Sequence, residues 1–176
     1  MRIVADSVTV RRAGRTLLNS VSLAFSEREL VVLAGGNGAG KTLLLKTLAG
    51  LVEPTAGTVC LEPANSAPPG ILFQEPDAQI LGRTVHEDLA IGIPKDDPEP
   101  SKRVARLLGL AGLSDRADQV CHKLSGGEKR RLTVAAALAS EPRLLLLDEP
   151  FTYLDYRSVV AALDQLLAVH RLGCGL

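Results

Sequence analysis

The residues with the clearest chemical potential lie at positions 35–42, which read Gly-Gly-Asn-Gly-Ala-Gly-Lys-Thr. This order matches the phosphate-binding loop G-x-x-x-x-G-K-[ST], in which backbone N–H groups at the positive end of a helix hold phosphate oxygens. The lysine adds a charge for the outer phosphates, and the threonine hydroxyl can ligate Mg²⁺. The residues predicted to bind nucleotide are Gly36, Asn37, Gly38, Ala39, Gly40, Lys41 and Thr42.

A second set of candidate residues follows four leucines at 144–147. An apolar run this short predicts a strand buried on both faces, and Asp148 and Glu149 emerge at its carboxyl end, where parallel sheets bind ligands. Phosphoryl transfer needs a metal to spread charge and a carboxylate to orient the nucleophile. An acid kept at a strand end for solubility is the alternative interpretation of Glu149.

The elements that must position these residues can also be read from local patterns. Residues 30–34 form an apolar run typical of a buried parallel strand, and residues 43–49 have the pattern of a helix. The order of strand, glycine loop and helix favours a nucleotide site over a chance glycine turn. Gln74 ends a further apolar triplet at 71–73, another candidate for a buried strand.

Residues 125–128 read Ser-Gly-Gly-Glu, with the spacing of a capping box, and predict a helix from there to about residue 139. Ser125, Gly126 and Gly127 would form its free N-terminus, which is a second candidate anion site. Apolar residues at helical spacing after position 159 predict a last helix that ends at Gly173.

The remaining segments predict an α/β fold with an antiparallel β region at the N-terminus. Alternating patterns at 3–10 and 21–25 indicate two antiparallel strands, and residues 58–61 a third, short strand. Between positions 77 and 124 we expect a helical lobe: one helix begins at the capping box of Thr84, and Ser101 caps another that Gly109 closes. The predicted core is 1–76 and 125–176, the lobe is 77–124, and 94–100 is a surface linker.

Composition limits the classes of partner and compartment. The 176 residues suit one compact domain, and 20 basic against 20 acidic residues leave no net charge to favour nucleic acid or an anionic membrane. The three cysteines are far apart and are expected to be reduced, mostly packed thiols of a cytosolic protein. Because no apolar run approaches the ~20 residues that span a bilayer, any membrane role must come through a partner.

The phosphate loop, Leu124-Ser-Gly-Gly-Glu and the Asp-Glu-Pro at 148–150 stand in the order that is found in ATP-binding-cassette (ABC) ATPases, which the chain resembles over nearly its whole length. The resemblance implies a P-loop NTPase (RecA-like) core with an inserted helical lobe. It implies that Asp148 positions Mg²⁺ with Thr42, and that Glu149 polarises the water that attacks ATP. Gln74 resembles the family's mobile glutamine, which senses Mg²⁺ and this water.

The same resemblance implies a dimer. Ser125, Gly126 and Gly127 would serve the nucleotide held by an opposite ATPase subunit, and Leu154-Asp155 would cross the interface. Residues 73–81 and 84–92 look like those of energy-coupling-factor importers and of cobalt and nickel uptake systems. A membrane subunit would then be the partner, at the inner face of the cell membrane, for uptake of a vitamin or metal ion.

Three departures from the family pattern keep other functions open. No aromatic residue stands at 8–12 to stack on adenine, and Leu43 replaces a second hydroxyl residue. Members of the family continue past the last helix into a buried strand, which lies between the strands of the phosphate loop and of Asp148, and then into a switch histidine. Because this pattern is missing here, we expect the chain to be a shortened form. His170 lies too early to be the switch histidine and is expected to be a solvated helical residue. One alternative is a nucleotide-binding module with little hydrolysis. The other is a soluble ABC ATPase that acts on DNA or ribosomes; the short lobe and the lack of basic runs argue against this second alternative.

Overall fold

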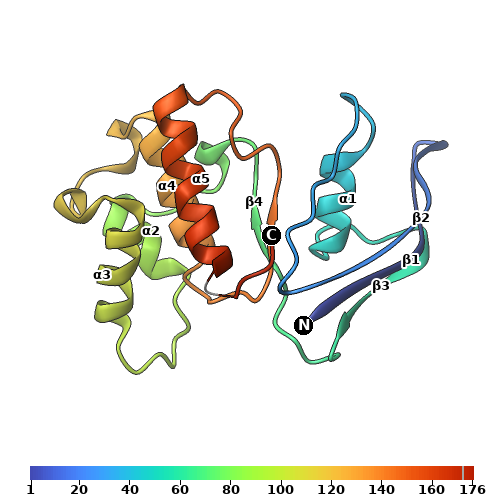
Figure 1. Cartoon of the computed structure of the whole chain (residues 1–176), viewed down its shortest axis with the longest axis horizontal. Helices are drawn as coiled ribbons and strands as arrows, with labels where there is room; N and C mark the ends of the chain where they lie inside the picture. Colours follow the sequence, from blue (N-terminus) through green and yellow to red (C-terminus); the bar gives the residue numbers. More distant parts are fainter. Residues whose placement is uncertain (172) are drawn as a thin grey trace.

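The structure is a computed structural model that describes residues 1–171 and 173–176. Strands β1–β3 with helix α1 form one half of the molecule, helices α2–α5 form the other, and strand β4 passes between them (Figure 1). The elements are β1 (Arg2–Arg12), β2 (Arg15–Ser26), α1 (Lys41–Leu48), β3 (Ala56–Glu62), β4 (Gly70–Leu72), α2 (Val85–Ile91), α3 (Pro100–Ala111), α4 (Gly126–Ala137), β5 (Leu145–Leu147) and α5 (Tyr156–Arg171). Three short 3-10 turns are η1 (Pro76–Ala78), η2 (Ser114–Arg116) and η3 (Cys121–Lys123).

The N-terminal sheet is antiparallel, with strand order β2-β1-β3. Alternation places Ile3 and Ala5 of β1 on a buried face, which packs against Leu44 and Leu48 of α1. The predicted antiparallel region is therefore confirmed, with longer strands than the alternating pattern alone indicated.

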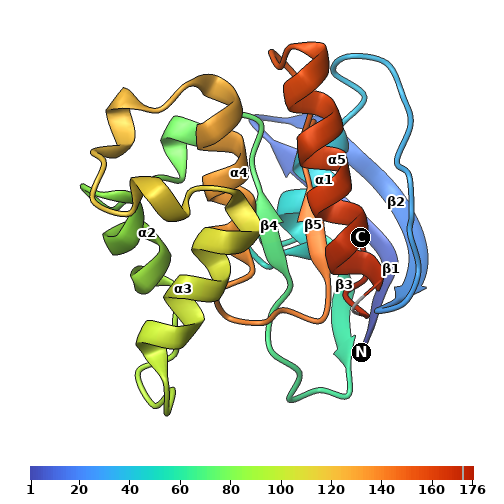
Figure 2. The same ribbon diagram turned by 60° about the vertical axis from the view of Figure 1, so that its left-hand side comes forward.

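Strands β4 and β5 form a separate parallel pair, in which Leu72 lies opposite Leu147 (Figure 2). The N–H of Asp148 donates to the carbonyl of Leu72 at 2.9 Å, so the pairing continues to the carboxyl ends. This register brings Gln74, Asp148 and Glu149 to the same edge, as expected for acids and amides that follow parallel strands.

The helical segment confirms one predicted helix start and corrects another. Thr84 caps α2 with both hydrogen bonds of a capping box. Helix α3, however, begins at Pro100 and continues through Gly109 to Ala111, so Ser101 is not its cap and residue 100 does not belong to the linker. Apolar burial decides the end of the helix, because residues on both sides of Gly109, including Leu108 and Ala111, pack in the lobe core.

The prediction of a buried strand at residues 30–34 is wrong. These residues make no ladder, and Leu30, Val31, Val32 and Leu33 have exposed fractions between 41% and 77%. Within the described part of the chain, their one backbone hydrogen bond is to the C-terminus, where the N–H of Val31 donates to the carbonyl of Leu176 at 2.8 Å. A strand needs a neighbour along its length for its hydrogen bonds, and among the described residues Leu176 supplies a single such bond to this segment.

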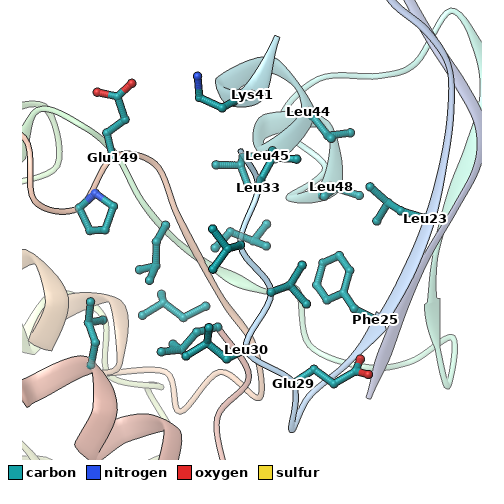
Figure 3. A pocket seen from close by; sticks show the side chains of 18 of the residues that line it. Leu23, Phe25, Glu29, Leu30, Leu33, Lys41, Leu44, Leu45, Leu48 and Glu149 are labelled. Atoms are coloured by element: carbon teal, nitrogen blue, oxygen red, sulfur yellow. The ribbon is translucent and has the colours of Figure 1, made fainter. Parts of the chain in front are cut away.

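Residues 175 and 176 lie between strand β5 and the segment that follows β2. Gly175 bridges Leu144 in parallel, and the N–H of Leu176 donates to the carbonyl of Glu29 at 3.1 Å. Leu176 lines an apolar groove of about 740 Å³ in this space; Figure 3 shows the groove from close by. Glu29 lies at one end of this groove, and Lys41 and Glu149 lie at the other. We call it the inter-strand groove; its walls include Leu30, Val31, Val32, Leu33, Leu145, Leu146, Leu147, Leu163, Leu166 and Leu167.

The structure also tests the expectations for His170 and for the three cysteines. His170 is half-buried rather than solvated, with Nδ1 3.0 Å from the carbonyl oxygen of Cys174. All three cysteines are free; Cys60 is exposed, whereas Cys121 and Cys174 are buried. Burial raises the pKa of the Cys174 thiol to about 11, which keeps it protonated and unreactive.

Candidate nucleotide-binding site

The phosphate loop leads directly into helix α1, whose N-cap is Gly40. Gly40 has a left-handed φ of 93°, and a Cβ there would lie 2.9 Å from Cδ2 of Leu18, so glycine is required. No side chain caps α1, which leaves its first N–H groups for an anion. The Nζ of Lys41 donates to the carbonyls of Gly35 and Gly36 at 2.9 and 3.0 Å, so the cation lies over the loop.

A side-chain hydrogen bond joins the loop helix to the residue that directly follows strand β5. The hydroxyl of Thr42 donates to Oδ1 of Asp148 at 2.9 Å, and Asp148 is buried. A hydroxyl and a carboxylate oxygen are suitable ligands for Mg²⁺, which takes one or two protein groups together with phosphate and water oxygens. Among the described residues there is no cluster of three His, Cys, Asp or Glu side chains, so an all-protein metal cage is not present there.

Glu149 accepts side-chain hydrogen bonds from two further residues at the same edge of the parallel pair. Its Oε2 accepts hydrogen bonds from Nε2 of Gln74 at 3.1 Å and from the hydroxyl of Thr152 at 3.0 Å. The residue has a left-handed φ of 46°, a conformation that costs a non-glycine residue energy and is found at functional sites. Sequence reasoning missed Thr152, although its place three residues after Glu149 in a turn was a usable signal.

These hydrogen bonds border one pocket of about 810 Å³. Asn37, Gly38, Gly40, Lys41 and Thr42 line it, together with Gln74 and Glu149. The structure thus brings most of the predicted phosphate residues and the water-orienting candidates together, whereas Gly36, Ala39 and Asp148 are not among the lining residues. Further lining residues, which were not predicted, are Arg12, Leu17, Leu43, Lys46, Val52 and Tyr153.

The predicted Ser-Gly-Gly-Glu motif at 125–128 lies at the N-terminus of α4 and does not line this pocket. Ser125 caps α4 with a complete capping box to Glu128, and Ser125 and Gly126 are exposed. A Cβ on Gly127 would lie 2.3 Å from Oγ of Ser158, so glycine allows α5 to approach closely. Asp155 accepts from the N–H of Ser158 at 2.8 Å, a bond that lowers the pKa of Asp155.

The capping box predicts a pH effect on stability. Hydrogen bonds from Ser125, with Arg116 nearby, hold the pKa of Glu128 below its usual 4.5 despite partial burial. A lowered folded-state pKa means that the carboxylate stabilises the fold above about pH 4.5 and that this contribution is lost as pH falls below it. We expect the variant Glu128→Gln to lose less thermal stability than wild type between pH 6 and pH 3 in melts followed by circular dichroism. Equal losses would contradict this assignment.

Comparison with known proteins agrees with the geometry. The family model described as "ABC transporter" matches residues 18–152, which include the phosphate loop, Gln74, the Ser-Gly-Gly-Glu helix and the Asp-Glu pair. The chain belongs to the ABC transporter family. The fold of this ABC protein is accordingly the expected one, a P-loop core with an N-terminal antiparallel sheet and an inserted helical lobe.

Relatives of this ABC chain include two named ATP-binding proteins of transport systems. It is 40% identical over 164 residues to the energy-coupling factor transporter ATP-binding protein EcfA1 of Thermotoga maritima, covering 88% of this chain and 63% of that protein. It is 37% identical to the cobalt import ATP-binding protein CbiO of Syntrophus aciditrophicus, covering 92% and 62%. The chain therefore spans less than two thirds of the length of these relatives.

A solved structure is also similar. The cbiO1 protein of Clostridium perfringens, described as part of the ABC transporter complex cbiONQ, superimposes with a TM-score of 0.82 at 28% identity. The match covers 98% of this chain and 75% of that one. The fold similarity thus includes the N-terminal sheet, the helical segment and the phosphate loop.

Proposed function

We propose that this ABC chain binds ATP in the pocket of Lys41 and hydrolyses it. The observation that carries the proposal is the 2.9 Å hydrogen bond between Thr42 and Asp148, because it joins the phosphate loop to the strand that bears the acids. Thr42, Asp148 and Gln74 would hold Mg²⁺, which supplies charge to stabilise the transferring phosphoryl group. Glu149 would orient the attacking water.

The proposal extends to two partners. Ser125, Gly126 and Gly127 lie at an exposed helix N-terminus away from the Lys41 pocket, which fits a nucleotide held by a second ATPase subunit. The names of EcfA1, an energy-coupling factor transporter protein, and of CbiO, a cobalt import protein, support a transport function, and we propose uptake of a vitamin or metal ion. No helix in the described part of the chain is long and apolar enough to cross a membrane. We therefore propose that it acts at the cytoplasmic face through a membrane subunit, with 1–76 and 125–176 as core and 77–124 as lobe.

Removal of the loop lysine tests the nucleotide site. We expect Lys41→Ala to weaken ATP binding about 10- to 150-fold, because charge-assisted hydrogen bonds contribute roughly 1.5–3 kcal/mol each. Titration of a fluorescent ATP analogue measures the change. Lys95→Ala, in the exposed linker, is the matched control and should bind like wild type. Equal affinity of Lys41→Ala and wild type would refute the site.

A second candidate function is a nucleotide-binding module with little hydrolysis. The side of the pocket that the N-terminal sheet forms favours it, since its lining residues Arg12 and Leu17 offer no aromatic ring for the base. Tyr153, which also lines the pocket, comes from the segment after the Asp-Glu-Pro at 148–150 instead. Steady-state phosphate release by the purified chain with MgATP separates the two functions. Binding without release supports the module, and release that is lost in Lys41→Ala supports the ATPase.

A further inference from the structure

Arg130 of helix α4 is completely buried, with an exposed fraction of 0%. A buried cation is costly unless its donors are satisfied. No ion pair of a described residue involves this guanidinium, and burial alone lowers its pKa. The reason for a charge at this position must therefore be found in its hydrogen bonds.

Both terminal nitrogens of Arg130 bond to consecutive backbone carbonyls. Nη1 donates to the carbonyl of Phe73 at 2.7 Å, and Nη2 donates to that of Gln74. The third nitrogen, Nε, has no partner among the described residues. Because a guanidinium presents its donors in a rigid planar fork, the two bonds fix the backbone at the point where the chain leaves β4.

The same backbone carries the side chain that reaches Glu149. Nε2 of Gln74 donates to Oε2 of Glu149 at 3.1 Å, so Arg130, Gln74 and Glu149 form one connected series. At the other end of the series, Arg130 lies little more than one helical turn after Ser125 on the same helix. A displacement of the α4 N-terminus therefore moves the support of Gln74 with it.

We propose that Arg130 is a positioning residue that couples the N-terminus of α4 to the placement of Gln74 against Glu149. The inference rests on the proposed ATPase function and extends it, because it lets the motif at Ser125 influence the water-orienting pair. A lysine at this position keeps the charge but offers a single point of donation, so it cannot hold both carbonyls in the same geometry.

The matched variants Arg130→Lys and Arg131→Lys test this coupling. Arg131 is the next residue of α4, and its Nε donates at 2.8 Å to the carbonyl of Ala111, within the lobe. We expect Arg130→Lys to lower kcat for ATP hydrolysis by about 10²-fold with KM unchanged, as misplacement of a reacting group by ~1 Å does. Arg131→Lys should keep both constants. A raised KM with unchanged kcat in Arg130→Lys would overturn the proposal.

A second measurement does not depend on turnover. In ¹⁵N-labelled protein, the side-chain amide signal of Gln74, assigned through its loss in Gln74→Leu, reports the environment of this group. We expect the signal to differ from wild type in Arg130→Lys and to match it in Arg131→Lys. An unchanged signal in Arg130→Lys refutes the coupling. A wild-type chain without hydrolysis refutes the proposed ATPase, and the amide signal then decides the role of Arg130 by itself.

Discussion

Replacement of Glu149 by glutamine is expected to abolish most ATP turnover while ATP remains bound. The amide oxygen can still accept the bonds from Gln74 and Thr152, so the local geometry is retained. What is lost is the negative charge that draws a proton from the attacking water. General-base groups contribute roughly 10²- to 10⁴-fold, and we expect kcat to fall by about this factor. Phosphate release and binding of a fluorescent ATP analogue measure the two quantities separately.

The control for this variant is Glu75→Gln. Glu75 is an exposed acid one residue beyond Gln74, and no role in the site is assigned to it. The variant Glu75→Gln removes one negative charge, as Glu149→Gln does, but from the neighbouring loop, and it should hydrolyse ATP like wild type. Equal rates for wild type and Glu149→Gln would remove Glu149 from the mechanism. A simultaneous loss of nucleotide affinity would instead indicate that the acid supports the pocket.

The second large effect is expected from filling the inter-strand groove. An added segment of about five apolar residues after Leu176, the usual length of a strand, would continue the parallel pairing that Gly175 begins with Leu144. It would cover Leu30, Val31 and Leu33, which are at least 41% exposed. Burial of the added side chains, together with the groove walls that they cover, stabilises the fold against the cost of ordering the segment. We expect the Tm to rise by about 5–10 °C.

Pairing rather than mere length must cause this rise. A control extension of equal length with proline at alternate positions cannot donate the ladder hydrogen bonds and should leave the Tm unchanged. Differential scanning calorimetry of the three proteins compares them directly. If the apolar and proline extensions melt together with wild type, the inter-strand groove is not a strand site, and the exposed leucines require another explanation.

Local patterns were sufficient for the phosphate loop and for several elements around it. The loop works through its own backbone and the helix that follows, so Gly40 and Lys41 lie within one short stretch of sequence. The capping boxes at Thr84 and Ser125 are likewise completed by a residue three positions later. Leu145 and Leu146 of β5 are buried as predicted, because an apolar run needs only to be covered, and Leu147 is half-buried.

Contacts between distant segments were decided only by the tertiary structure. The pairing of Gln74 with Glu149 and the bonds of Arg130 to two carbonyls depend on the register of β4 against β5 and on the packing of α4. Residues 30–34 also show that local sequence does not determine contacts between distant segments. Their sequence specifies an apolar, extended segment, but a strand also requires a neighbour that satisfies its N–H and C=O groups. Since that neighbour is not local, composition alone predicted a strand that the fold does not form.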